Sequence, residues 1–463
     1  MTAAAAPAKP TALQTRVSAE LSERLGAYTG RLAWNADRLA SHQQQRLRTL
    51  LAHAAEHSPF HRRRLGGLDA SHFQLSDLAR LPVMTKSQMM DSFDDVLTDR
   101  RLNRGLVEAH LAACQREPDL LFDRYVCLAS GGSSGQRGIF VQTLGEWLDF
   151  VASLVRPGDA NALAAGGPPP EGLVLGLVAA ASPVHSSGFG AAVAVGPPWR
   201  LIPAPATLPL AEIVARLNNA QPPALSGYPS KLAELAAEQL EGRLRIAPRS
   251  VMAVGELLTD PDRALIEQGF ATPVIDAFAS TEGLVGHSQP GGSVLSFASD
   301  MCLAEPVDDD NQPAPPGEPS TKVLVTNLHN FTQPLVRYEL TDGFTSQTSA
   351  PGGWLRASVE GRADDAFHYA SVAVHPHVIR SALVSQAAVR EYQVRQTERG
   401  VDVACVADSD FDQTALAARL QHALCEAGLA EPQVSIKTVP AISRHPDTGK
   451  VKRFIPMTST RSG

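Results

Sequence analysis

A short segment rich in glycine and serine is the feature of this sequence that most suggests chemistry. Residues 130–138 read S-G-G-S-S-G-Q-R-G and lie between two segments typical of β-strands. Backbone N–H groups in such a loop, with serine hydroxyls beside them, can hold phosphate or other anionic oxygens. Because each ordered glycine costs roughly 0.5–1 kcal/mol relative to alanine, a plain hairpin turn would rarely contain four. We predict an oxyanion-binding loop formed by Ser130, Gly132, Ser133, Ser134 and Gly135.

Other interpretations of this loop make different demands on its surroundings. The simplest is a hairpin tip with no ligand. A Walker A loop requires Gly-Lys-Ser/Thr, and here Arg137 is followed by Gly138. Residues 131–135 do match the G-x-S-x-G elbow of hydrolases, with Ser133 as nucleophile, but that elbow joins a strand to a helix. The residues after Gly138 are typical of a strand, so the sequence favours anion binding and leaves a serine hydrolase as an alternative.

Polar and charged side chains later in the chain are further candidates for a functional site. Thr281 and Glu282 follow a β-type run. Asp342 ends the segment 334–342. Lys450 lies in the basic segment 448–453. Each has a structural alternative, since Thr281 and Glu282 are also a helix-capping pair and Lys450 is also typical of a surface turn.

These residues belong to a chain in which strand and helix patterns alternate, as in α/β folds. The β-type runs include residues 125–129, 139–142, 173–179, 250–254 and 274–278. Between them, apolar residues recur at helical spacing in segments 210–217 and 232–240, the second with Ser230 as its expected N-cap. We predict that these helices each lay one face on a sheet.

The two ends of the chain differ from this central region. Residues 17–57 are helix-like, and we expect a helical cap over residues 1–90. After Gly361 the order helix, strand, strand, helix, strand predicts a compact α+β unit of about one hundred residues, which is large enough to fold separately. We therefore divide the chain into a large domain, residues 1–360, and a small domain, residues 361–463.

The composition excludes several classes of partner. Lys and Arg number 41 against 48 Asp and Glu, a net charge of −7, so the chain lacks the basic surplus of nucleic-acid-binding proteins. The five cysteines are scattered, which indicates buried thiols in a reducing compartment. Residues 173–181, the longest apolar run, are about half a membrane span, and residues 1–10 lack a signal-peptide pattern. We expect a cytoplasmic protein that binds neither nucleic acid nor membrane.

The order of these motifs resembles that of the adenylate-forming superfamily of acyl-CoA ligases and adenylation domains, in particular its phenylacetate-CoA ligase-like branch. The segments that carry the resemblance are the glycine loop, Gly255-Glu256, residues 276–283 (D-A-F-A-S-T-E-G), 334–342 (P-L-V-R-Y-E-L-T-D), 361–365 (G-R-A-D-D) and 448–453 (T-G-K-V-K-R). Gly131, Arg137 and Ala279 depart from the family pattern. The resemblance implies a large multi-sheet α/β domain followed by a small, mobile α+β domain.

The resemblance also implies which residues bind the nucleotide. Adenine is contacted by Gly255 and Glu256 and stacked on Phe278. The α-phosphate is bound by Thr281, and Mg²⁺ is held by Glu282. The ribose is bound by Asp342, with Arg362 beside it.

Three further assignments follow from the same resemblance. Asp364 is the hinge about which the small domain turns, and Lys450 spans the acid carboxylate and the phosphate during adenylation. The pocket for the acid is assigned to His185, Tyr228 and Ala279. His287 and Cys302 are too few for the Cys/His metal site that some members of the branch carry.

The implied reaction is ATP-dependent activation of an aryl or other small organic acid as acyl-AMP, followed by transfer to CoA or to a carrier-protein thiol. ATP and Mg²⁺ are the expected cofactors, with CoA or phosphopantetheine as acceptor. Ser371 stands where the family has a glycine lining the pantetheine tunnel, so an amine acceptor stays open, as does an oxyanion other than a carboxylate. A non-catalytic nucleotide- or acyl-binding relative is a further alternative, although Glu282, Asp342, Arg362 and Lys450 are all present.

Overall fold

The computed structural model describes residues 10–130, 138–164, 166–167, 172–348, 352–362, 365–370, 372–374, 376–384, 386 and 388–457. The helices are α1 (Ala12–Arg31), α2 (Ala36–His57), α3 (Pro59–Leu65), the 3₁₀ helix η1 (Leu75–Arg80), α4 (Lys86–Asp91), α5 (Phe93–Val96), α6 (Arg104–Ala113), α7 (Leu144–Ala164), α8 (Ser186–Val193), α9 (Leu210–Ala220), α10 (Pro229–Leu240), α11 (Asp260–Phe270), α12 (Pro376–Val384) and α13 (Gln413–Glu426).

The strands are β1 (Tyr125–Ala129), β2 (Ile139–Thr143), β3 (Leu173–Val178), β4 (Val195–Gly196), β5 (Trp199–Pro203), β6 (Ala224–Gly227), β7 (Ser250–Val254), β8 (Val274–Ala279), β9 (Val285–Ser288), β10 (Leu295–Phe297), β11 (Cys302–Val307), β12 (Lys322–Asn327), β13 (Tyr338–Leu340), β14 (Asp342–Ser346), β15 (Arg356–Arg362), β16 (Phe367–His368), β17 (Ala373–Val374), β18 (Val389–Thr397), β19 (Gly400–Ala407), β20 (Gln433–Thr438) and β21 (Phe454–Ile455).

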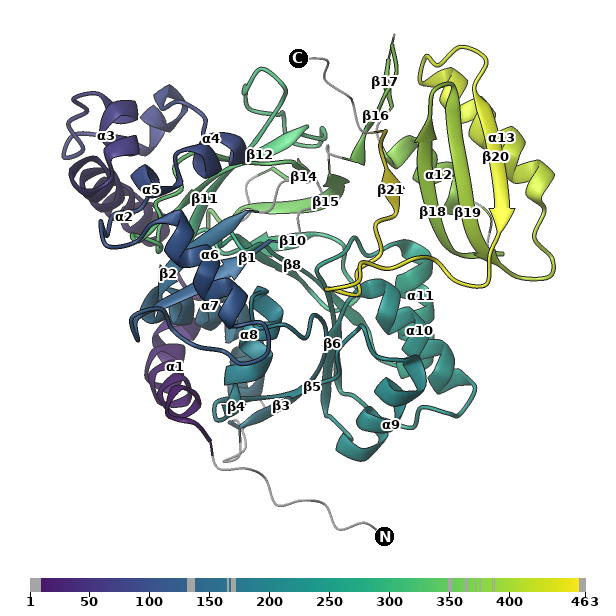
Figure 1. The fold of residues 1–463 in the computed structure, drawn as a ribbon, viewed down its shortest axis with the longest axis horizontal. Coiled ribbons are helices and arrows are strands. Elements are labelled where there is room, and N and C mark those ends of the chain that lie inside the picture. Colours follow the sequence, from purple (N-terminus) through teal and green to yellow (C-terminus); the bar gives the residue numbers. More distant parts are fainter. Residues whose placement is uncertain are drawn as a thin grey trace.

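A ten-stranded sheet forms the centre of the large domain, in the order β14-β15-β10-β9-β8-β7-β6-β3-β5-β4 (Figure 1). Its middle strands, from β5 to β8, pair in parallel, whereas β8 pairs antiparallel with β9. The amphipathic helices α9, α10 and α11 bury Ile213, Leu232 and Ile266 completely. Parallel strands need such helical crossovers, so the alternating pattern in the sequence leads to this layered arrangement. The predicted α/β fold is confirmed.

Helix α10 begins two residues earlier than its sequence pattern suggested. Its N-cap is Tyr228 and its first residue is Pro229, whose fixed φ suits the first turn of a helix. The expectation that Ser230 is the N-cap is therefore wrong. Ser230 lies within the first turn, and its hydroxyl accepts a hydrogen bond from Arg444 at 3.0 Å.

The N-terminal helices are joined closely to the large domain. The helix-like stretch 17–57 is two helices, because Asn35 caps α2 and accepts a hydrogen bond from the N–H of Arg38 at 3.0 Å. Further along, Met84 bridges in parallel with Tyr338 of β13, and its N–H donates to the carbonyl of Arg337 at 2.9 Å. The cap predicted over residues 1–90 therefore contributes backbone pairing to a sheet.

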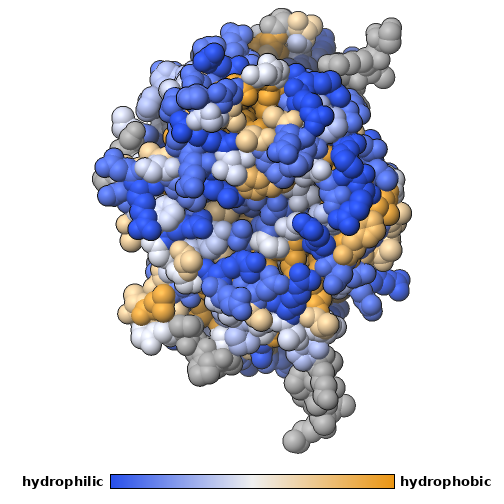
Figure 2. All heavy atoms as spheres, turned by 90° about the vertical axis from the view of Figure 1, so that its left-hand side faces the viewer, coloured by the Kyte–Doolittle hydropathy of each residue, from blue (hydrophilic) through white to orange (hydrophobic). Residues whose placement is uncertain are grey.

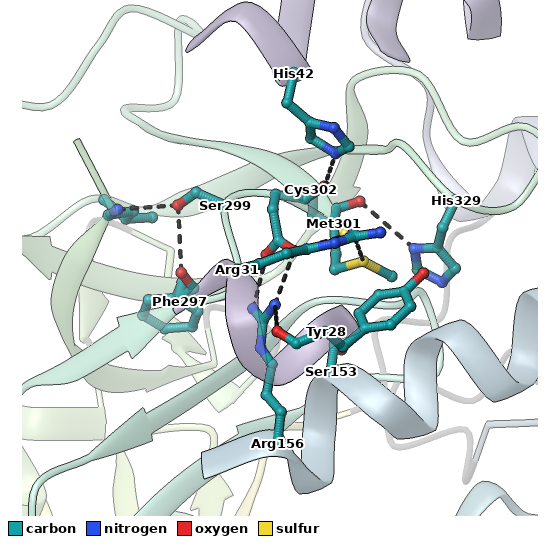
Figure 3. Close-up of polar contacts among 12 residues, drawn as sticks. Tyr28, Arg31, His42, Ser153, Arg156, Phe297, Ser299, Met301, Cys302 and His329 are labelled. Carbon is teal, nitrogen blue, oxygen red and sulfur yellow. Dashed lines mark hydrogen bonds and ion pairs between the residues drawn. The ribbon is translucent and has the colours of Figure 1, made fainter. Parts of the chain in front are cut away.

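A buried ion cluster ties α1 and α7 to the segment between β10 and β11 (Figure 3). Arg156 donates to both carboxylate oxygens of Asp300, at 2.8 and 2.7 Å, and Arg31 donates to one of them at 3.3 Å. The Arg156 and Asp300 side chains are 2% and 0% exposed. These contacts hold the carboxylate ionised, and the pKa of Asp300 is lowered although burial opposes the shift.

The C-terminal residues form a separate core. Strands β20-β19-β18-β21 make a four-stranded sheet, and Val394, Val403, Leu416 and Leu420 are among its buried residues. Among the described residues, the buried members of this core all lie between Phe367 and Phe454. The division near Gly361 stays a prediction, with which this packing is compatible.

One face of the molecule is shown as a space-filling view in Figure 2. Figure 2 shows the side that lies at the left of Figure 1, where hydrophilic residues are interleaved with smaller hydrophobic patches. Within the described ranges, no helix is long and apolar enough to cross a bilayer.

Candidate active site

A tight turn after β8 presents Thr281 and Glu282. The N–H of Gly283 donates to the carbonyl of Ser280 and the N–H of Ser280 donates to that of Leu284, both at 3.0 Å. Gly283 has φ of +105°, and a Cβ there would lie 2.3 Å from Nδ2 of Asn327. Asn327 in turn donates to the carbonyl of Glu282 at 2.7 Å. Only glycine fits this position, and the position of Glu282 is fixed from both sides.

Glu282 is a buried carboxylate with cations around it. Glu282 is 8% exposed. Burial raises the pKa of its carboxyl group above the ordinary value of a glutamate. Lys86 and Arg362 lower this pKa, while Asp342 raises it further. A cation placed directly beside such a buried carboxylate stabilises its ionised form.

Lys86 acts on Glu282 through its charge, an effect that the sequence did not predict. It is the first residue of α4, whose N-cap Thr85 accepts a hydrogen bond from the N–H of Gln88 at 3.2 Å. The capping pattern was readable from the sequence, but it predicts only where the helix starts. Nothing in that pattern indicated that the charge of this lysine lowers the pKa of a glutamate about 200 residues later in the chain.

Asp342 and Arg362 are held opposite each other in the central sheet. They are direct partners in the antiparallel register of β14 and β15. Nη2 of Arg362 also donates to the hydroxyl of Thr341 at 3.1 Å. The charges of both residues act on Glu282 and on Lys450, so the structure brings these four predicted site residues together.

Lys450 comes from a tight turn of the small domain. Arg444 and Val451 form an antiparallel bridge, and the N–H of His445 donates to the carbonyl of Lys450 at 2.8 Å. Nζ of Lys450 lies 5.2 Å from the centre of the Tyr228 ring. Burial lowers the pKa of Lys450 and Glu256 opposes this change. The ammonium therefore lies over an aromatic face, a favourable position for a cation.

Gly255 and Glu256 lie directly against this lysine. Gly255 has φ of +87°, and a Cβ there would be 3.1 Å from the Tyr228 ring and 3.3 Å from Nζ of Lys450. The Glu256 carboxylate accepts hydrogen bonds from the N–H of Val451 at 2.8 Å and of Ser230 at 3.3 Å. The adenine contacts assigned to these two residues stay predictions. The contacts to Val451 and Ser230 were not anticipated.

The described ends of the glycine loop form a hairpin. β1 and β2 pair antiparallel, and Ser130 and Gly138 close the loop through Oγ of Ser130, which accepts from the N–H of Gly138 at 2.9 Å. The loop joins two strands, so it lacks the strand-to-helix context of a hydrolase elbow. Gly132, Ser133, Ser134 and Gly135 lie outside the described residues.

The three residues assigned to the acid pocket occupy different surroundings. His185 lies beside the loop, where its Nδ1 donates to the carbonyl of Ala129 at 3.0 Å. Tyr228 is 3% exposed, accepts from the N–H of Ala180 at 3.0 Å, and has its pKa raised by burial to about 12. Ala279 ends β8, next to Phe278, whose ring packs 5.4 Å from that of Phe344. The pocket assignment and the adenine stacking on Phe278 stay predictions.

A cavity of about 210 Å³ lies at the ends of β3 and β5, close to these residues. Its lining includes Ala180, Gly188 and Pro205, mostly small apolar residues, together with Arg116. His185, Tyr228 and Ala279 do not line it.

Two residues singled out in the sequence have no described position in the structure. The hinge Asp364 and Ser371 lie outside the described residues. In the part of the chain that the structure describes, no three His, Cys, Asp or Glu side chains are grouped to hold a metal ion. A single carboxylate is compatible with Mg²⁺, which is commonly bound through one or two carboxylates together with substrate phosphates.

Similarity to known protein families and to curated proteins is limited to one partial match. No family model matches the chain. Protein CapK from Staphylococcus aureus is 23% identical over 151 residues, which are 32% of this chain and 32% of CapK. The match therefore spans about a third of the length of that relative.

Solved structures match far more of the chain. 2-Hydroxyisobutyryl-CoA ligase in the postadenylation state, in complex with 2-HIB-AMP, is 19% identical with a TM-score of 0.70, covering 92% of this chain and 90% of that one. The same ligase with 2-HIB-AMP and CoA in the thioesterification state is 20% identical, with a TM-score of 0.57 over 91% and 90%. A benzoate CoA ligase from Burkholderia xenovorans LB400 is 18% identical, with a TM-score of 0.52 over 71% and 67%.

These neighbours confirm the adenylate-forming fold. The overall arrangement is more similar to the postadenylation structure than to the thioesterification structure of the same ligase. The assignment to the phenylacetate-CoA ligase-like branch stays a prediction.

Proposed function

We propose that this chain, whose fold is that of AMP-forming CoA ligases, activates a carboxylic acid with ATP as an acyl-adenylate and then transfers the acyl group to a thiol. One observation carries the proposal. Asp342 and Arg362 are register partners in β14 and β15, and the charges of both act on Glu282 and on Lys450. A carboxylate suited to a metal ion and an ammonium suited to an anion thus share one centre with groups suited to a ribose.

In the first half-reaction, an oxygen of the acid attacks the α-phosphorus of ATP. The bond between that phosphorus and the bridging oxygen breaks, and pyrophosphate leaves with the electron pair. Both reactants are anions, so Lys450 and Arg362 would reduce their repulsion and stabilise the developing charge. Asp342 would accept hydrogen bonds from the ribose hydroxyls. Glu282 would hold Mg²⁺, which supplies positive charge to the phosphates when bound.

In the second half-reaction, a thiol attacks the carbonyl carbon of the acyl-adenylate and AMP leaves. The neighbouring ligases are named for 2-hydroxyisobutyrate and benzoate, and one of them binds CoA together with its adenylate. We therefore propose a small organic acid as substrate and CoA as acceptor. A carrier-protein thiol and an amine are the alternatives to CoA.

Pyrophosphate release tests this function. The full chain is incubated with ATP, Mg²⁺ and a panel that includes 2-hydroxyisobutyrate, benzoate, other aryl and alkyl acids and amino acids, with and without CoA. We expect release that depends on one acid, and AMP and thioester formation when CoA is added. Release without thioester would favour another acceptor. No acid-dependent release with any acid would favour a non-catalytic nucleotide-binding relative.

The lysine assignment predicts a large effect of Lys450→Ala. Removing one preorganised cation at the reacting phosphate should lower acid-dependent pyrophosphate release by about 100-fold or more. ATP binding, followed by calorimetry, should persist because the other nucleotide contacts remain. Near-normal release by the variant would remove Lys450 from the reaction.

A further inference from the structure

Two arginines of the small domain flank Lys450, and both contact the large domain. Arg444 lies six residues before the lysine and Arg453 three residues after it. In Figure 1 the loop between β20 and β21, which carries all three, reaches from the small domain toward α10 and α11. These two helices begin beside the candidate site.

Arg444 joins the two domains through a group of four acceptors. In the large domain it donates to the hydroxyl of Ser230 at 3.0 Å and to the carboxylate of Glu234, both on α10. In the small domain it donates to Glu391 of β18 at 3.1 Å and to the carbonyl of Gly449 at 3.2 Å. The Arg444 side chain is 17% exposed. This one guanidinium therefore fixes the lysine turn to both its own sheet and the opposite helix.

Arg453 makes a second, more buried connection. Its Nη2 donates to Asp262 in the first turn of α11 at 2.7 Å, and the two side chains are 11% and 7% exposed. Asp262 also accepts from the hydroxyl of Thr259, the N-cap of α11, at 2.8 Å. The Arg453 guanidinium lies 5.1 Å from the centre of the Tyr392 ring of the small domain.

Glu256 adds a third connection between these two. Its carboxylate accepts from the N–H of Val451, the residue after the lysine, and from the N–H of Ser230 in the first turn of α10. The backbone of the lysine turn is thus held against the large domain at Val451, between the contacts of Arg444 and Arg453.

We propose that Arg444 and Arg453 are positioning residues that hold Lys450 in the centre for the first half-reaction by pairing with α10 and α11. The proposal rests on the proposed function. Neither arginine needs to touch substrate, because each acts through the placement of the lysine turn. The arrangement of the chain is also more similar to a postadenylation structure than to a thioesterification structure, in agreement with this role. Loss of either pair should therefore weaken the first half-reaction and spare the second.

The kinetic test compares the two half-reactions in Arg453→Gln and Arg444→Gln. We expect acid-dependent pyrophosphate release to fall about tenfold in each, the factor that corresponds to one broken interdomain contact of about 1.4 kcal/mol. Thioester formation from separately supplied acyl-adenylate and CoA should stay within about twofold of the parent rate. Arg453→Lys, which keeps the charge, should recover part of the first rate. Equal loss of both half-reactions would overturn the proposal.

A matched control removes an arginine from the small domain without touching the interface. Arg390 of β18 pairs with Asp408 in the same domain and is 63% exposed. Arg390→Gln should leave both half-reactions unchanged. Thermal unfolding of every variant shows whether the chain is folded, and if Arg453→Gln does not fold, Arg444→Gln and Arg453→Lys still decide the outcome.

A distance measurement tests the proposal without any acid. Cys425 on α13 is exposed, whereas Cys114, Cys127, Cys302 and Cys405 are buried, so Cys425 and an added Leu240→Cys on α10 accept one spin label each. Leu240 is 50% exposed. We expect one short, narrow distance distribution in the parent chain and a longer, broader one in Arg453→Gln. Unchanged distributions in both arginine variants would refute the inference even if adenylation is established, and a shift would support it even if no acid is activated.

Discussion

Two buried arginine–aspartate pairs in this molecule differ in where they lie and in how completely the carboxylate is satisfied. Arg156 and Asp300 are inside the large domain, and Asp300 receives three hydrogen bonds from two arginines. Arg453 and Asp262 connect the two domains, with one hydrogen bond from arginine and one from Thr259. Their pKa values move in opposite directions, because the arginines outweigh burial at Asp300 whereas burial outweighs Arg453 at Asp262.

Arg156 and Asp300 have the properties expected of a permanent contact, whereas Arg453 and Asp262 have those of a contact that can separate. When the domains part, Arg453 and Asp262 both regain water, so the desolvation that opposes their pairing is relieved. Arg156 and Asp300 have no such route short of unfolding. The number of hydrogen bonds to the carboxylate thus separates a contact that stabilises the fold from one that would break if the small domain turns about the predicted hinge Asp364.

The largest effect is expected for Arg156→Met, which tests whether the Arg156–Asp300 pair stabilises the fold. Removing one partner of a buried pair leaves an uncompensated charge, and we expect the free energy of unfolding to fall by about 3–5 kcal/mol. Urea unfolding at neutral pH measures the loss. The ratio of the two half-reactions should not change in the folded fraction. A loss below about 1 kcal/mol would mean that Arg31 alone satisfies Asp300.

Asp276 is a third buried aspartate beside an arginine, and its ion pair is longer than those of Asp300 and Asp262. Nη2 of Arg263 lies 3.8 Å from its carboxylate, and burial raises the pKa of Asp276 from 3.8 to about 6. A raised carboxyl pKa means that the folded state binds the proton more tightly, so the free energy of unfolding falls as pH rises from about 4 to 6. Asp276→Asn removes this dependence.

We therefore compare the free energy of unfolding of Asp276→Asn with that of the parent chain at pH 4 and at pH 7. The variant should be more stable relative to the parent at pH 7 than at pH 4, by up to about 3 kcal/mol. Denaturant unfolding at both pH values measures the difference. A difference that is equal at pH 4 and pH 7 would show that Arg263 offsets the burial of the carboxylate.

A side chain added at Gly449, where the lysine turn contacts the large domain, should displace that turn without unfolding the large domain. Gly449 has φ of +74°, and a Cβ there would lie 2.9 Å from Ala206. Alanine in the left-handed region costs about 1–2 kcal/mol, so Gly449→Ala should slow acid-dependent pyrophosphate release by about 5- to 30-fold. Gly26→Ala, in the middle of α1 with open space around it, is the matched control and should not slow the reaction. Equal rates in the two variants would contradict this expectation.

The smallest effect is expected at an exposed pair. Arg216 and Glu212 on α9 are 45% and 47% exposed and 2.8 Å apart. Because exposed ion pairs contribute about 0–1 kcal/mol, Arg216→Gln should change neither unfolding nor either half-reaction measurably. A larger loss would mean that exposure is a poor guide to which arginines matter in this molecule.

The sequence predicted those parts of the molecule that depend on local periodicity. The parallel strands β3, β7 and β8 follow from short apolar runs, and α9 and α10 follow from helical spacing, whereas α11 was not predicted. The start of α10 was misplaced because serine is the commoner N-cap, whereas Pro229 sets the first turn here. The break between α1 and α2 was missed because Gly30 lies inside the last turn of α1 and no proline follows it, so Asn35 is the clearest signal of the new helix.

Candidate site residues were proposed from the sequence where residue type and motif order were distinctive, and not where contact depends on distant packing. Glu282, Asp342, Arg362 and Lys450 were identified, and the structure brings them together. Lys86 and Arg444 escaped notice, and Arg453 was noted only as part of the segment 448–453, because lysine and arginine are common on surfaces. Only the fold shows which acidic groups they meet. Sequence spacing carries no information about such pairings.

The bridge between Met84 and Tyr338 has a consequence for how the chain matures during its synthesis. Its two sides are roughly 250 residues apart, and the cluster that buries Leu47, Leu50 and Leu51 also needs Leu328 and Val336. A nascent chain that has left the ribosome as far as α4 must therefore keep these leucines without their final partners until most of the large domain has been translated. Truncation after β9 would leave the first helices folded at best loosely, with an apolar surface available to chaperones or to other chains.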